Sequence, residues 1–260
     1  MKRINENLEK NIVNDYLNNI STMAITRKYN ISRSTVQKYL IKNNIKFHKR
    51  MTSKIFNHNF FSDYTKESCY WAGFILADGY LRKKTNGLEI LLHKKDSEHL
   101  LNFTKLLGFR EDIRKFYKIG CSISICSNKI KEDLENNFEI FNNKSLTCYI
   151  SEKIPKELVS HFIRGYFDGD GTFNCENRFQ FLGTFKTCDY IRNFFKENGI
   201  VKQNGETPKI TLRKNKHDLY YVKYSKNLSK KIYEILFENS YDKIRLKRKY
   251  DKINEYLKTL

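Results

Sequence analysis

Two apolar stretches of similar make-up stand out in the pattern of hydrophobic and polar positions along the chain. They are YWAGFILADGY at residues 70–80 and HFIRGYFDGDGTF at residues 161–173. Each is long enough for a buried helix and ends in an acid followed by glycine, a residue that commonly stops helices. The two acids, Asp78 and Asp170, are 92 positions apart. The pattern therefore predicts two related buried helices, one in each half of a repeat.

The same order of elements is expected after each of these helices. A pair of alternating strands comes first, then a helix stopped by glycine, then a second pair of strands and a last helix. The chain is therefore predicted to have an α+β fold with two pseudosymmetric α-β-β-α-β-β-α halves, residues 67–157 and 158–260. The expected segments are 80–84, 87–95, 96–108, 112–119, 121–127 and 128–138 in the first half, and 171–176, 178–186, 188–199, 208–214, 219–225 and 226–237 in the second.

One face of each predicted sheet is polar. In RFQFLG, Phe179 and Phe181 point one way and Arg178 and Gln180 the other, and KITLRK alternates in the same manner. A solvated antiparallel sheet alternates too, but this face is rich in donors and poor in acids, which favours contact with DNA bases and phosphates. The candidate DNA-binding residues on the two sheets are Arg82, His93, Arg114, Arg178, Gln180, Lys209, Thr211, Arg213 and Lys223.

Residues 1–43 are predicted to form a small all-α domain of three short helices. Ser32 is placed to cap the third helix, and a turn around Asn30 and Ile31 joins that helix to the second. Apolar residues at helical spacing are expected to fill the small core of this domain. They are Ala24, Ile25, Tyr29, Ile31, Val36 and Leu40.

The stretch ISRSTVQKYL resembles the helix-turn-helix of resolvase-type recombinases. The resemblance implies that the third helix enters the DNA major groove. The alternative is a three-helix unit without that role. The side chains on the exposed side of the third helix would be Arg33, Ser34, Gln37 and Lys38. Residues 44–66 lose helical periodicity and are predicted to be a basic linker, which either follows the DNA or is a solvated tether.

The charge balance points to a polyanionic partner. The 260 residues include 49 Lys plus Arg against 29 Asp plus Glu, a formal net charge of +20. Cationic side chains release counterions from nucleic acid, so nucleic acid is the expected partner. An anionic membrane is the alternative, but no basic amphipathic helix with a broad apolar face stands out.

The remaining composition excludes several protein classes. Hydrophobic residues make up 40% of the chain, enough for a real core, so wholesale disorder is excluded. No apolar run approaches the roughly 20 residues that span a bilayer. The start, MKRINENLEKN, has no signal-peptide core, and the cysteines form no CxxC pair. We expect a cytoplasmic protein with reduced thiols, encoded by a bacterium, a phage or an organelle.

Small residues predict how the two buried helices meet. Gly73 and Ala77 are spaced i, i+4, and so are Gly165 and Gly169, so each pair shares one face of its helix. Small residues on such a face let two backbones approach closely. We therefore expect the two helices to cross at these positions, with their C-terminal ends side by side.

That arrangement brings Asp78 and Asp170 together. Two carboxylates at two helix C-termini repel each other and the negative ends of the helix dipoles. A divalent cation resolves the conflict, and Mg²⁺ suits carboxylate, carbonyl, water and phosphate oxygens. Metals placed in this way activate water and stabilise the leaving oxygen in phosphodiester hydrolysis. The sequence therefore predicts Mg²⁺, or Mn²⁺, held between the two acids.

Three other interpretations of these motifs compete. An EF-hand loop is contradicted by Phe173 at its obligatory glycine position and Phe179 at its final glutamate position. A plain turn after a helix does not account for two copies in matching positions. An HNH-type nuclease around His58 and Asn59 lacks spaced partner ligands.

WAGFILADG, at 71–79, and IRGYFDGDG, at 163–171, resemble the paired motifs of LAGLIDADG homing endonucleases. The longer stretch IPKELVSHFIRGYFDGDGTF and the closing LKRKY are also similar to that family, so the resemblance covers roughly residues 66–260. It implies a pseudosymmetric monomer whose two sheets form a saddle on a long, asymmetric DNA site. It implies double-strand cleavage across the minor groove, leaving staggered 3′ overhangs.

The resemblance also implies roles for particular residues. Asp78 and Asp170 would bind metal, and the residues before them, Ala77 and Gly169, would add backbone carbonyls. Basic residues near the end of each half commonly support the metal site, and Lys144 and Lys249 occupy such places; ordinary phosphate contact is the alternative. They are the candidate catalytic lysines.

One departure from the family pattern concerns the first motif, which has Leu76 where the second has Asp168. The earlier acid is more variable in this family and is not the principal metal ligand, so the departure weakens symmetry more than catalysis. The first active centre is then either fully active, slower or degenerate. Two functions follow for testing. The first is a site-specific DNA endonuclease, and the second is a non-cutting binder on the same scaffold, either a transcription regulator or an intron-splicing maturase that binds RNA.

Overall fold

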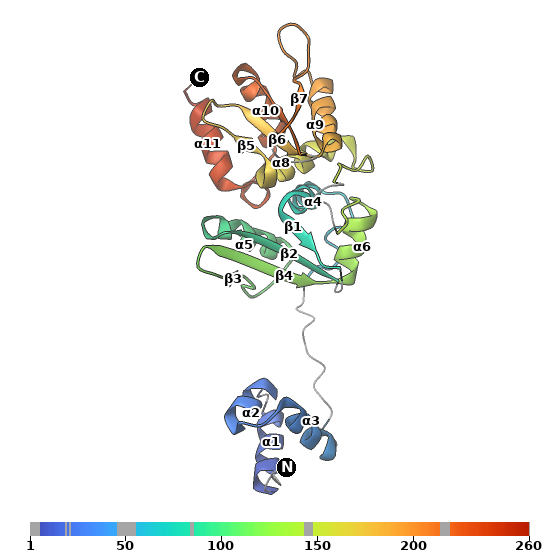
Figure 1. Cartoon of the computed structure of the whole chain (residues 1–260), viewed down its shortest axis with the longest axis vertical. Helices are drawn as coiled ribbons and strands as arrows, with labels where there is room; N and C mark the ends of the chain where they lie inside the picture. Colours follow the sequence, from blue (N-terminus) through green and yellow to red (C-terminus); the bar gives the residue numbers. More distant parts are fainter. Residues whose placement is uncertain are drawn as a thin grey trace. The chain divides into compact units, whose positions relative to one another are not determined.

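The structure is a computed structural model that describes residues 6–18, 20, 22–45, 56–83, 86–142, 148–213 and 219–259. The chain divides into two compact units, Met1–Lys54 and Ile55–Leu260 (Figure 1). None of the helices in the described part of the chain is long and apolar enough to cross a membrane.

The smaller unit holds three helices around one apolar core. Ser32 caps the third helix as predicted, because its hydroxyl accepts a hydrogen bond from the Thr35 amide at 3.1 Å. Asn30 has a φ of 48° in the turn before that cap, a conformation that asparagine tolerates. The helices are α1 (Glu6–Leu17), α2 (Thr22–Tyr29) and α3 (Arg33–Lys42). The buried core residues are Ile12, Tyr16, Ile25, Val36 and Leu40.

Ala24 is not in this core, contrary to the prediction, and its side chain is exposed. Ile25 and Tyr29 pack inward from the same face of α2, and Ala24 lies about 100° away around the helix. A partly buried ion pair joins α2 to α1, because Asp15 accepts from Lys28 at 2.8 Å and from the Tyr29 hydroxyl at 2.8 Å.

The predicted linker is shorter than 44–66 at its C-terminal end. Phe61 is fully buried in the core of the larger unit, and Phe56 stacks on Phe109 with ring centroids 4.5 Å apart. The aromatic residues of this stretch have apolar surface to bury, so the chain packs on the first half. The predicted basic residues of the linker lie outside the described residues; they are Lys46, Lys49, Arg50 and Lys54.

The larger unit confirms the predicted α+β fold with two halves of the same element order (Figure 1). The sheets have equivalent antiparallel orders, β1-β2-β4-β3 and β5-β6-β8-β7. The first half comprises α4 (Lys66–Asp78), β1 (Gly79–Leu81), β2 (Gly87–His93), α5 (Ser97–Leu106), β3 (Lys115–Phe116), β4 (Gly120–Cys126) and α6 (Asn128–Asn136). The second comprises α8 (Val159–Asp170), β5 (Thr172–Phe173), β6 (Phe179–Gly183), α9 (Phe185–Glu197), β7 (Ile210–Leu212), β8 (Tyr220–Lys223) and α10 (Ser229–Phe237).

The second half contains one more helix, which comes after the last predicted one. The chain passes from α10 through a short 3₁₀ turn, η4 (Asp242–Ile244), into α11 (Lys247–Leu257). The sequence KRKYDKINEYL is mostly polar, and Ile253 is its buried residue, so the apolar pattern of this helix is weak. We call residues 238–246, which join α10 to α11, the connecting segment.

Strand β6 presents one face to the helices and the other outward, as the alternation predicts, whereas on β7 the side chain of Leu212 is exposed, contrary to the alternation of KITLRK. Phe179 and Phe181 on β6 are buried, whereas Gln180 between them is half-buried. Across the sheet Gln180 lies opposite Lys223, and Thr211 lies opposite Tyr221. Polar side chains of three strands therefore share the outward face of the second sheet.

Helices α4 and α8 pack against each other where the two halves meet (Figure 1). A Cβ atom on Gly73 would lie 2.0 Å from the Phe162 carbonyl oxygen, and one on Gly165 would lie 1.9 Å from the Tyr70 carbonyl oxygen. These distances leave no space for any side chain. The contacts are reciprocal, because each glycine of one helix meets the backbone of the other at the equivalent position of the repeat.

Candidate active site

Asp78 and Asp170 are the last residues of α4 and α8, and both side chains are exposed. A Cβ on Gly169 would lie 2.3 Å from the Ala77 Cβ and 3.4 Å from Asp78 Oδ2. The Asp78 carboxylate is thus placed against the last turn of α8, next to the residue that precedes Asp170. The structure therefore brings together the ends of the two helices that carry the two acids.

Lys249 of α11 lies at the end of α8. Its ammonium donates to the carbonyl oxygens of Phe167 at 2.7 Å, Gly171 at 2.6 Å and Gly169 at 3.3 Å. A cation bonded to the last carbonyls of a helix satisfies them and opposes the negative end of the helix dipole. Burial lowers the pKa of Lys249 to about 8, and the negative charges of neighbouring acids oppose that shift.

Lys144, the other predicted catalytic lysine, lies outside the described residues. The pairing of Lys144 with Lys249 across the two halves therefore stays a prediction.

The residues at the helix ends fit a divalent metal that keeps water. The two exposed carboxylates and the carbonyl oxygens of Ala77 and Gly169 are hard donors. Among the described residues no three His, Cys, Asp or Glu side chains gather into a metal site. Mg²⁺ is commonly bound in this way, through one or two carboxylates with waters and substrate phosphate completing the shell. Lys249 uses one lone pair of the Gly169 carbonyl, and a carbonyl oxygen has two.

Asp168 is not part of this exposed group. Its side chain is 2% exposed, and Oδ2 accepts from the Tyr70 hydroxyl at 2.7 Å and from the Leu246 amide at 2.7 Å. Burial raises the pKa of Asp168 to about 6, although the nearby Lys249 ammonium favours the charged form. The equivalent residue, Leu76, is buried in the apolar core.

Sequence reasoning missed Arg164, which lies on α8 one turn before Asp168. It is 1% exposed and donates to the carbonyls of Leu236 at 2.6 Å and Ile244 at 2.8 Å. It also donates to His161 Nδ1 at 2.8 Å, which fixes that histidine as an acceptor at Nδ1. The signal was present, because an arginine within the apolar run HFIRGYF must be buried with hydrogen-bond partners.

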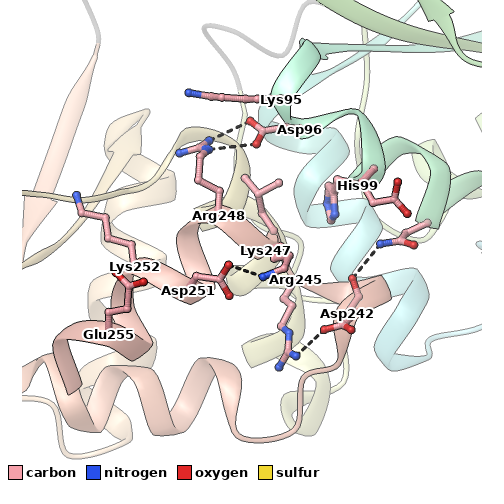
Figure 2. A pocket seen from close by; sticks show the side chains of 13 residues that line it. Lys95, Asp96, His99, Asp242, Arg245, Lys247, Arg248, Asp251, Lys252 and Glu255 are labelled. Carbon is pink, nitrogen blue, oxygen red and sulfur yellow. Dashed lines mark hydrogen bonds and ion pairs between the residues drawn. The ribbon is translucent and has the colours of Figure 1, made fainter. Parts of the chain in front are cut away.

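A pocket of about 600 Å³ lies between α5, the connecting segment and α11 (Figure 2). Basic and acidic side chains line it in equal number, so it presents no excess of one charge. Three ion pairs form among them: Arg248 with Asp96 at 3.0 Å, Arg245 with Asp242 at 2.6 Å and Lys247 with Asp251 at 2.5 Å. His99 also lines the pocket; its Nε2 lies 2.9 Å from the Tyr70 hydroxyl, and burial lowers its pKa to about 3.

Several predicted DNA-binding cations are paired with acids. Arg82 bonds Glu89 at 2.8 Å in the first sheet. Arg114 bonds Asp112 at 2.6 Å and the Ser97 carbonyl at 3.0 Å, which ties it to the body of the first half. In the second sheet Glu176 bonds Lys223 at 2.5 Å and approaches Arg178 at 3.6 Å. These acids compete with phosphate for the cations, a feature that composition does not disclose.

The other predicted DNA-binding residues are more accessible, and their roles stay predictions. Lys209, Thr211 and Arg213 are exposed on and beside β7. His93 Nδ1 accepts from the Lys95 amide at 3.2 Å. In the smaller unit the side chains of Arg33, Ser34 and Lys38 are exposed and Gln37 is half-buried.

Comparison with known proteins identifies the fold. No family model matches the chain. The structure resembles that of the I-SmaMI LAGLIDADG homing endonuclease bound to cleaved DNA, with a TM-score of 0.51 and 14% identity over 75% of this chain and 88% of that one. It is also similar to I-DmoI in complex with DNA and Ca, with a TM-score of 0.49 and 16% identity over 76% of this chain and 99% of that one. The larger unit therefore has the LAGLIDADG homing endonuclease fold.

One curated sequence is similar to part of the chain. A probable translation initiation factor IF-2 from Methanocaldococcus jannaschii is 31% identical over 120 residues, which are 45% of this chain. The chain spans 10% of the length of that protein.

Proposed function

We propose that this protein is a site-specific double-stranded DNA endonuclease that requires a divalent metal. The observation that carries the proposal is the placement of Asp78 and Asp170 at adjoining ends of two helices that are packed through glycine. The fold of DNA endonucleases supports it, and so does the net charge of +20, which suits a polyanionic substrate.

The chain's residues have distinct tasks in this mechanism. A divalent cation held by Asp78, Asp170 and the carbonyls of Ala77 and Gly169 would activate water and stabilise the leaving oxygen of the phosphodiester. Lys249 adds a fixed positive charge beside the reacting phosphate, where negative charge develops in the transition state. The close helix contact at Gly73 and Gly165 would keep the two helix ends, and with them the two acids, in place. The scissile phosphate would be positioned by the outward faces of the sheets.

The smaller unit would extend the DNA contact. Its three helices surround a separate core, and α3 presents three exposed polar side chains of the four predicted to read DNA. We propose that α3 acts as the recognition helix of a helix-turn-helix and enters the major groove. One chain with two pseudosymmetric halves would act as a monomer on a long asymmetric site.

The proposal is tested by selecting cleaved duplexes from a randomised DNA library with Mg²⁺ and the full chain. Asp78→Asn and Asp170→Asn should each slow cleavage of the selected site at least about a hundredfold, while binding measured in Ca²⁺ stays within a few-fold. Glu206→Gln, at an exposed acid outside the site, is the control and should cut like wild type.

The alternative functions are outcomes of the same experiment. Tight DNA binding with no cleavage in Mg²⁺ or Mn²⁺ would identify a transcription regulator on this scaffold. Preferential binding of structured RNA over duplex DNA would identify a maturase. Cleavage that survives Asp170→Asn would show that the metal assignment is wrong.

A further inference from the structure

We propose that Arg164 and Asp168 are positioning residues, which hold the connecting segment against α8 and so set the place of Lys249 at the end of that helix. The inference deepens the proposed function and rests on it for its catalytic consequence. The positioning itself is a property of the fold and is tested separately.

Arg164 ties the last turn of α10 and the connecting segment to α8. Its guanidinium bonds the carbonyls of Leu236, at the end of α10, and Ile244, in η4. The fork of a guanidinium has a fixed geometry, so two simultaneous bonds define how far apart these two points lie. A buried guanidinium is costly unless its donors are satisfied, and here they bond the last turn of α10, the connecting segment and His161.

Asp168 holds the segment where α11 begins. Leu246 is the residue that precedes the first turn of α11, and its amide donates to the buried carboxylate at 2.7 Å. The N-terminus of a helix carries positive partial charge, so a carboxylate there stabilises the helix start. Asp168 therefore serves α11 as a cap supplied by another helix.

Lys249 lies three residues after Leu246, in the first turn of α11. Its three carbonyl partners belong to the turn of chain that carries Asp168 and Asp170. The structure thus closes a ring of contacts, from α8 through Asp168 to the start of α11, and back through Lys249 to the end of α8. Displacement of the start of α11 would draw the ammonium away from these carbonyls.

Side chains of the first half hold the same segment from the other side. Trp71 Nε1 donates to the Lys243 carbonyl at 3.2 Å, and the Asn102 amide donates to the Asp242 carbonyl at 3.2 Å, beside the pocket shown in Figure 2. In the repeat, the positions equivalent to Arg164 and Asp168 are Ala72 and Leu76, whose side chains have no hydrogen-bonding atom. The hydrogen bonds that Arg164 and Asp168 make therefore have no counterpart at the equivalent positions of α4.

The test compares three variants of the full chain. Asp168→Leu installs the side chain of the first half, and Asp168→Asn keeps the shape and an acceptor for the Leu246 amide. Tyr70→Phe is the control, because it removes the other hydrogen bond to the same carboxylate oxygen, together with the hydroxyl's contact to His99, and leaves the Leu246 contact. Hydrogen exchange of residues 242–249 reports positioning, and strand-resolved cleavage with Mg²⁺ reports its consequence.

Asp168→Leu should raise exchange in 242–249 about tenfold or more, as expected for loss of a charged hydrogen bond. It should also slow cleavage of one DNA strand about tenfold more than the other, so that nicked product accumulates. Asp168→Asn and Tyr70→Phe should stay within about threefold of wild type in both measurements. A general loss of stability would not be rescued by asparagine and would not distinguish the strands.

Unchanged exchange in folded Asp168→Leu would overturn the positioning role, and equal slowing of both strands would overturn its link to one active centre. If Asp168→Leu fails to fold, Arg164→Lys replaces it; the lysine keeps a charge but loses the fork, so unchanged exchange there would overturn the proposal. If wild type cuts no DNA, the proposed function fails, and the exchange experiment alone decides the positioning.

Discussion

The two halves of the larger unit share the glycine contact between α4 and α8, and they differ in the side chains near the C-terminal ends of these helices. Gly73 and Gly165 make the same contact in opposite directions, each against the backbone of the other helix. Two residues before the acids, however, the first half has Leu76 in the apolar core and the second has Asp168 in a polar network. The comparison teaches that symmetry is retained where the backbones of α4 and α8 touch, and that it is lost where side chains of α8 anchor the connecting segment.

The largest effect is expected from substitutions at the glycine contact that both halves share. Gly73→Ala and Gly165→Ala should each destabilise the larger unit by about 3 kcal/mol or more, because the added Cβ meets backbone that cannot move without separating the helices. Urea unfolding measures both. Lys196→Ala, on the exposed side of α9, is the control and should change little. A large loss at one glycine with tolerance at the other would show that the contact is not reciprocal.

Substitution of Lys249, which lies in the second half next to the Asp168 network, tests the difference between the halves. Lys249→Met should slow DNA cleavage tenfold to about a hundredfold, because a positive charge beside the phosphate and the donor to the α8 carbonyls are both lost. Affinity for DNA in Ca²⁺ should change less than about threefold. The control is Lys252→Met on the same helix, where the ammonium bonds the Phe173 carbonyl at 2.7 Å. Equal losses from the two substitutions would count against a special role for Lys249.

The pH dependence of stability tests the buried titratable groups of both halves. Burial lowers the pKa of His99 to about 3 and of His161 to about 4, from 6.5, so unfolded chains bind more protons than folded ones below pH 6.5. Stability from these two groups is therefore lost as pH falls. Burial raises the pKa of Asp168 from 3.8 to about 6, so its contribution has the opposite sign over that window.

On unfolding between pH 6 and 4, the two histidines take up two protons and Asp168 releases one. The free energy of unfolding should therefore fall by on the order of 1 kcal/mol for each pH unit of acidification. Urea unfolding at a series of pH values measures the slope. His161→Gln cannot take up the proton and keeps an acceptor for Arg164, so its slope should be flatter. An identical slope in that variant would mean that His161 contributes nothing to it.

The smallest expected effect compares the two sheets. Lys209→Ala, at an exposed position beside β7, should lower the slope of log affinity against log salt by about 0.9, the value for one phosphate contact. Arg82→Ala should lower it less, because Glu89 already balances that charge. Glu89→Gln should strengthen binding. Fluorescence anisotropy between 50 and 200 mM salt, as order-of-magnitude limits, checks all three. Equal changes at Lys209 and Arg82 would show that the ion pair opens on DNA.

The sequence was a good guide where structure depends on local pattern. Helix and strand order, the inward Phe179 and Phe181, and the cap at Ser32 all follow from spacing within a few residues, and the structure agrees. The weakly apolar α11 was missed because a single buried residue leaves little periodicity.

In the candidate site, too, local motifs were predictable from the sequence and contacts between distant residues were not. Repeated motifs marked Asp78 and Asp170, whereas the partners of Arg164 and Asp168 lie about 80 residues further along the chain and leave no trace in local pattern. The acids that pair with predicted DNA-binding cations were likewise invisible, because cross-strand neighbours depend on register.

The connecting segment also fixes the order in which the protein can fold during synthesis. Helix α8 is made before its buried guanidinium can meet Leu236 and Ile244, which follow Arg164 by 72 and 80 residues. The Trp71 bond to Lys243 closes over 172 residues. On the ribosome, where domains generally form as their chain emerges, the junction of the two halves therefore stays incomplete until the connecting segment has left the exit tunnel. The first sheet can form early, and the helix end that carries Asp170 is among the last parts to be secured.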